Sequence, residues 1–98
     1  MKLININQIT GKKEQLFADD ILKVYYLTFD KGEVLPHHSL NGIGVIQILE
    51  GHITIEFSTG DVFNLTTGDM LEFKSFILHT VKAIEKTKLL LTNASYSN

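Results

Sequence analysis

Histidine is the residue type in this sequence best suited to bind a metal or to move a proton near neutral pH. Two of its four histidines, His37 and His38, stand side by side before an almost unbroken apolar run, and His79 lies far downstream. The fourth, His52, follows a glycine typical of a turn and is expected to face solvent. Chemistry at these residues therefore depends on whether the fold brings His38 and His79 together.

The composition excludes several classes of function. The chain contains no cysteine, which rules out disulfides, thiolate metal sites and cysteine nucleophiles. The formal charge of −2 and the scattered lysines argue against a nucleic-acid partner, which normally requires clustered positive charge. No stretch approaches the roughly 20 consecutive apolar residues of a membrane helix. We therefore expect a cytoplasmic protein without a nucleic-acid or membrane partner.

The elements that must position the histidines are predicted to be short β-strands. Residues 52–57 alternate, so that Ile53, Ile55 and Phe57 share one face. Residues 21–29 are rich in aromatic and β-branched side chains and end at an Asp-Lys-Gly turn. Seven or eight such strands, separated by turn residues and without a convincing helix, predict an antiparallel all-β sandwich or barrel.

The spacing of glycines and histidines resembles the two motifs of the cupin superfamily, and in particular its small cupin-2 type barrels. The first motif, G-x5-H-x-H-x3-E-x6-G, is matched at Gly32, His38 and Gly51. The second motif, G-x5-P-x-G-x2-H-x3-N, is matched at Gly68 and His79. The unmatched positions of the two motifs hold Leu40, Gly44, Lys74, Phe76 and Ala83.

The resemblance covers roughly residues 24–92 and implies a jelly-roll barrel, or double-stranded β-helix, of about eight short strands. We accordingly expect a single cupin domain over residues 1–98, with a core at about 24–92 and an N-terminal arm over 1–20.

The same resemblance identifies a degenerate metal motif. Typical cupins bind a divalent metal through three histidines and one glutamate. Here His38 and His79 remain, whereas Leu40 and Gly44 replace the other two ligands and cannot coordinate. Because two imidazoles rarely retain a metal, we expect no cofactor. The alternative is Fe, Mn, Ni, Zn or Cu held with a replacement ligand: Gln47, Glu72, or His37 brought inward by a bulge.

Strand alternation then predicts which side chains wall the barrel interior. If His79 and His38 point inward, Val81 and Ala83 do so as well, as do Leu40, Gly44, Ile46 and Ile48, while His37 faces away. One of Tyr25 and Tyr26 should line the cavity and the other should pack outside. The predicted ligand site comprises His38, Leu40, Ile46, Ile48, His79 and Val81.

Two imidazoles in an apolar pocket favour the binding of a small organic molecule, with no catalytic residue assigned. The alternative is a metal-dependent cupin enzyme of the dioxygenase, isomerase or decarboxylase type. A sensory or interaction module is a third reading, since the resemblance implies a fold that hosts many roles.

Two further expectations concern assembly and turns. If Ile46 and Ile48 face the cavity, then Val45 and Leu49 must be covered elsewhere, and a homodimer would cover them. Gly51 and Gly68 are expected in turns that require a positive φ angle.

Overall fold

The computed structural model describes residues 1–96, of which the side chains of residues 36–38 lie outside the description. This part of the chain is all-β, as predicted, and its strands pair antiparallel. Its elements are η1 (Ile6–Gln8), β1 (Lys13–Ala18), β2 (Leu22–Phe29), β3 (Val34–His38), β4 (Ile43–Glu50), β5 (His52–Phe57), β6 (Val62–Thr66), β7 (Met70–Lys74), β8 (His79–Ala83) and β9 (Thr87–Ala94). No helix among the described residues is long and apolar enough to cross a membrane.

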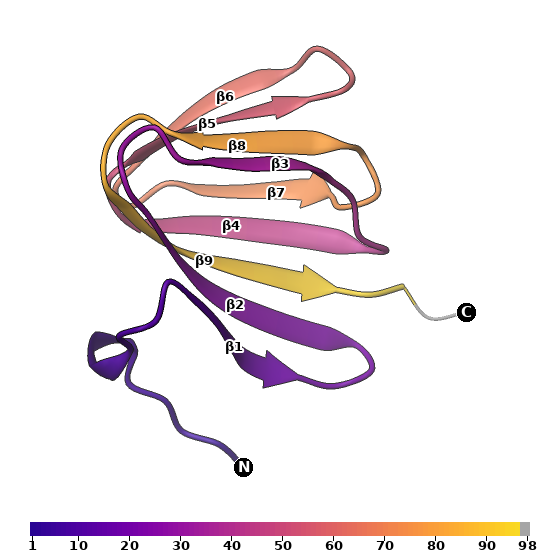
Figure 1. Ribbon diagram of the computed structural model, residues 1–98. Helices are drawn as coiled ribbons and strands as arrows, with labels where there is room; N and C mark the ends of the chain where they lie inside the picture. The colour runs from indigo at the N-terminus through magenta and orange to yellow at the C-terminus, as the bar shows by residue number, and fades with distance from the viewer. Residues whose placement is uncertain (97–98) are drawn as a thin grey trace.

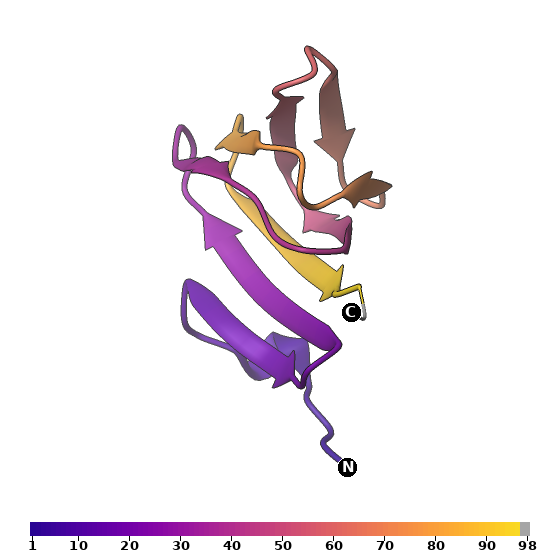
Figure 2. The same cartoon turned by 90° about the vertical axis from the view of Figure 1, so that its right-hand side faces the viewer.

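Two sheets form the molecule (Figure 1). One has five strands in the order β1-β2-β9-β4-β7, and the other has four in the order β3-β8-β5-β6. Apart from the consecutive pairs β1–β2 and β5–β6, neighbouring strands in each sheet come from distant parts of the chain, as the jelly-roll prediction requires. Figure 2 shows the β1–β2 hairpin extending past the four-stranded sheet. The hairpin therefore forms the edge of the five-stranded sheet that is farthest from β4 and β7.

The core fills the space between the sheets and follows from strand alternation. Ile46 and Ile48 of β4 are 2% and 1% exposed, and Ile53 and Ile55 of β5 are fully buried. Full burial of one such side chain stabilises the fold by about 1.5–3 kcal/mol. The residues of β8 that were predicted to point into the barrel do so: Val81 and Ala83 are buried, whereas Thr80 and Lys82 are not.

The strand β3 interrupts this regularity. Leu35 pairs with Val81 and His38 pairs with His79, so three steps along β3 oppose two steps along β8. The extra residue makes a β-bulge, where Pro36 lacks the N–H that a regular ladder needs. Leu35 packs against the core. Leu35 therefore faces the interior because of the bulge, whereas uninterrupted alternation, in which His38 points inward, would turn Leu35 outward.

Candidate ligand-binding site

His79 lies at the start of β8, inside the barrel, and is 3% exposed. Its ring contacts Phe57 and Phe73, whose centroids are 5.6 and 4.9 Å away. Its Nδ1 lies 2.8 Å from the carbonyl oxygen of Ile77, which can only accept a hydrogen bond. Nδ1 therefore carries a proton, and in the neutral ring the lone pair lies on Nε2.

The backbone of His38 lies opposite that of His79 in the β3–β8 ladder. This register agrees with the motif alignment, which places both residues at ligand positions. The side chains of His37 and His38 are outside the described part of the structure. The predicted approach of the two rings, and the outward direction of His37, therefore remain predictions.

A small cavity of about 10 Å³ lies beside His79 between the two sheets. Of the residues predicted for the ligand site, Ile46 and Val81 line this cavity, whereas Ile48 is buried outside its lining. The remaining wall consists of Leu27, Phe29, Leu35, Leu89 and Leu91. This volume has room for about one water molecule, so the closed interior holds no organic ligand as it stands. We call this space the inner cavity.

A larger hollow of about 220 Å³ opens outside the inner cavity, and we call it the mouth hollow. Leu27, Leu35 and Leu91 line both spaces, so these three side chains separate the mouth hollow from His79. The other lining residues are Lys13, Tyr25 and Leu40.

Leu40 does not occupy the barrel interior that alternation predicted. It is 39% exposed and lies beyond β3, which ends at His38. Its backbone N–H donates to the carbonyl of Ser75 at 2.8 Å, which holds the loop at the edge of the mouth hollow. Alternation failed here because it applies only while the strand continues.

The lining of the mouth hollow was only partly foreseen from sequence. Of the two tyrosines, Tyr25 lines the hollow, and Tyr26 is buried on the opposite face near Ile6 and Ile9 of the N-terminal arm. Lys13, Leu27, Leu35 and Leu91 were not predicted as site residues. Alternation along residues 21–29 could have found Leu27, because it shares a face with Tyr25. Lys13 has no such local signal.

The described residues do not fit the four-ligand metal centre of typical cupins. A Cβ at Gly44, the position of the motif glutamate, would lie 2.6 Å from Cζ of Phe73. The space of the missing carboxylate is therefore filled by an aromatic ring. Among the described residues, no group of three or more His, Asp or Glu side chains could hold a metal.

Two of the three replacement ligands considered from sequence, Gln47 and Glu72, also lie away from His79, and the side chain of the third, His37, is outside the described part of the structure. Gln47 alternates with the buried Ile46 and Ile48 and pairs with Leu90 on the outer face of the five-stranded sheet. Glu72 is exposed on the edge strand β7.

No protein-family model matches the sequence, and no curated protein does. Several solved structures are similar in fold. An RmlC-like cupin protein from Desulfovibrio desulfuricans is 26% identical, with a TM-score of 0.83 and 96% of each chain covered. A cupin superfamily protein from Desulfitobacterium hafniense is 20% identical, with a TM-score of 0.80, covering 86% of this chain and 76% of its own.

An RmlC-like cupin with a double-stranded β-helix fold from Methanocaldococcus jannaschii is 16% identical, with a TM-score of 0.80. It covers 95% of this chain and 87% of its own. Together with the two-sheet topology and the motif positions, these likenesses confirm the resemblance predicted from sequence. The chain has the RmlC-like, double-stranded β-helix fold and is a small domain of the cupin superfamily.

Proposed function

We propose that this protein binds a small organic molecule in the mouth hollow. The observation that carries the proposal is the junction of the two spaces: an open, mostly apolar hollow shares three leucine side chains with the cavity beside His79. Ligand sites commonly combine apolar walls with a few polar groups that fix orientation. Tyr25 and Lys13 are such groups at the rim. His79, with His38 proposed beside it, lies behind the three leucines and lines the inner cavity.

The volume of the mouth hollow limits the size of the ligand that it can hold. Pockets for drug-sized molecules measure roughly 300–1,000 Å³, and the mouth hollow is smaller, at about 220 Å³. We therefore expect a molecule of about one ring or a short branched chain. A metal-dependent enzyme has less support, since Phe73 fills the space at Gly44 that a fourth ligand would need.

The experiment is an NMR titration with a neutral probe, benzyl alcohol, followed on backbone amide signals. We expect shifts at Tyr25 and Leu91, which line the mouth hollow, and none at Val45 on the far side of the five-stranded sheet. Leu40→Trp should narrow the hollow and weaken binding several-fold. Leu78→Trp is the matched control, because Leu78 is similarly exposed, at 45%, and lies outside the hollow. Equal weakening by both variants, or no shift at Tyr25, would contradict the proposal.

A further inference from the structure

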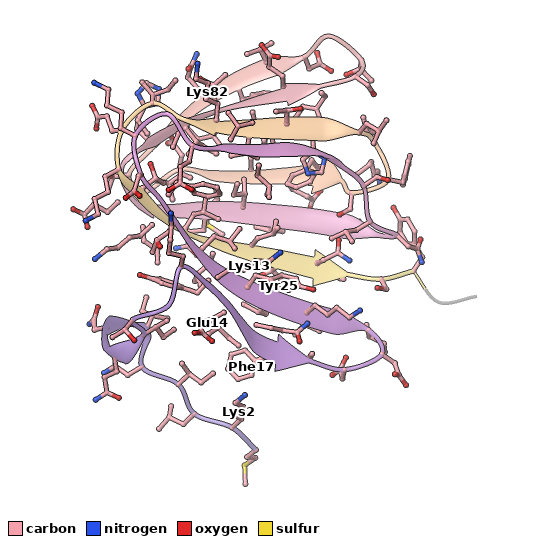
Figure 3. All side chains as sticks on the ribbon, viewed as in Figure 1. Lys2, Lys13, Glu14, Phe17, Tyr25 and Lys82 are labelled. Carbon is pink, nitrogen blue, oxygen red and sulfur yellow. The ribbon has the colours of Figure 1, made fainter. Side chains whose placement is uncertain are left out.

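The face of the β1–β2 hairpin that includes the core residue Leu27 also carries polar side chains. Lys13 pairs with Leu27, and Gln15 pairs with Tyr25. Directly opposed residues point to the same face of a sheet, and Leu27 belongs to the buried core. Lys13, Gln15 and Tyr25 therefore face the mouth hollow side of the hairpin. Lys13 and Tyr25, labelled in Figure 3, both line the hollow.

The hydroxyl of Tyr25 is oriented by its neighbour. The Nε2 of Gln15 donates to the Tyr25 oxygen at 3.3 Å. Because that oxygen accepts from the amide, the hydroxyl hydrogen is directed to a different side of the oxygen. Tyr25 is therefore suited to donate a hydrogen bond to a ligand acceptor in the hollow.

The charged group that lines the mouth hollow is positive. Among the described side chains, the lining contains the ammonium group of Lys13 and no carboxylate. The neighbouring Lys12 differs, since it forms ion pairs with Asp30 and Glu33. Within residues 1–96, leaving out the side chains at 36–38, Lys13 forms no ion pair. The mouth hollow thus has an apolar floor of leucines and a rim with one positive charge and one hydroxyl donor.

Building on the proposed function, we infer that the ligand is a small organic carboxylate. Its apolar body would lie on Leu27, Leu35 and Leu91, and its carboxylate would accept hydrogen bonds from Lys13 Nζ and from the hydroxyl of Tyr25. One lysine supplies one positive charge, which matches a singly charged carboxylate. Hydrogen bonds between charged partners are stronger than those between neutral ones, so this contact should decide selectivity.

The test compares benzoate with benzyl alcohol, which share a ring and differ in charge, by NMR titration of the wild-type chain. We expect benzoate to bind about tenfold more tightly than benzyl alcohol, a ratio that falls as salt is added. Lys13→Met keeps most of the apolar stem and removes the charge, so it should bring the ratio close to one by weakening benzoate binding much more than benzyl alcohol binding. Lys82→Met is the matched control: Lys82 is exposed on β8, away from the hollow, and the charge change is the same.

The outcomes separate the two proposals. If benzyl alcohol binds in the hollow and benzoate binds no better, the carboxylate inference is wrong and the proposed site stands. If Lys82→Met lowers the ratio as much as Lys13→Met, the preference comes from net charge, and the assignment to Lys13 is wrong. If neither probe binds, the proposed site fails and the inference fails with it.

Discussion

The ring of Phe73 on β7 occupies the space into which a side chain at Gly44 on β4 would extend. A Cβ built at Gly44 would lie 2.6 Å from Phe73 Cζ and 2.9 Å from Ser75 Oγ. The two residues are directly paired in the β4–β7 ladder. Phe73 also contacts His79, with ring centroids 4.9 Å apart. The glycine at the motif's glutamate position thus lets an aromatic ring pack against His79.

Gly44→Ala should destabilise the fold by about 1–3 kcal/mol, because the added methyl group overpacks this site. Phe73→Leu removes the obstructing ring atoms, so the double variant should be more stable than the sum of the single effects predicts. Urea denaturation of the wild type, the two single variants and the double variant gives the four free energies of unfolding that a double-mutant cycle requires. If the losses of the two single variants simply added up in the double variant, the alanine methyl group at Gly44 would not be in energetic conflict with the ring of Phe73.

Protein purified without added metal should contain well under one equivalent of transition metal, by elemental analysis. The reason is that two imidazoles rarely retain a metal, and Leu40 and Gly44 supply no further ligand. His79→Ala and His52→Ala serve as a test and a control. A stoichiometric metal that is lost in His79→Ala and kept in His52→Ala would overturn this prediction and favour the enzyme alternative.

Gly51 and Gly68 should differ in their tolerance of alanine although both have positive φ angles, of 118° and 91°. At Gly68 no atom lies within 4 Å of an added Cβ, so only backbone strain of about 1–2 kcal/mol is expected. At Gly51 the Cβ would lie 2.4 Å from Thr87 Oγ1 and 2.5 Å from the Lys86 carbonyl oxygen. We expect Gly51→Ala to lose more than about 3 kcal/mol in chemical denaturation. Equal losses would show that the contacts at Gly51 relax.

Glu33 should make stability depend on acidic pH. Its pKa is lowered from 4.5 by the hydrogen bond from Lys12 and by the backbone N–H of Asp30, which donates at 2.9 Å. A carboxyl group with a lowered folded pKa stabilises the fold above its usual pKa. That contribution is lost as pH falls through the folded value. Below pH 4.5, therefore, the Tm difference between wild type and Glu33→Gln should shrink. Glu56→Gln, at an exposed position on β5, is the control. A Glu33→Gln difference that stays constant on acidification would contradict the prediction.

We also expect a homodimer formed through the outer face of the five-stranded sheet. Val24, Thr92 and Val45 form one row across this face, and Leu90 lies in the next. Their side chains are only half-buried, and Met70 at the sheet edge is 63% exposed. A patch of this kind is uncommon on a monomer.

Light scattering at micromolar concentration should give twice the chain mass. Val45→Lys should reduce it to one chain mass, and Thr54→Lys on the other sheet should not. A monomeric wild type would refute the interface.

Much of the fold could be predicted from local patterns. Alternation is a property of the strand itself, so it correctly placed Ile46, Ile48 and Val81 inside without knowledge of their partners. The positive φ angles of Gly51 and Gly68 followed from motif position. The spacing of glycines and histidines then predicted the cupin topology, which alternation alone does not determine.

The candidate site was less predictable, because it depends on contacts between distant segments. The bulge in β3 turns Leu35 toward the interior. The strand ends at His38, so alternation does not extend to Leu40. Lys13 reaches the mouth hollow only because β1 pairs with β2 and the hairpin extends past the opposite sheet.

Residue types and spacing thus determined the strands, the fold family and the loss of two metal-ligand positions. Tertiary structure alone decided that Phe73 fills the space beside Gly44, that the interior at His79 is nearly closed, and that the open hollow lies outside it. The physical reason is that a strand's own periodicity sets the direction of its side chains. Free volume, by contrast, is what remains after side chains from several strands have packed against one another.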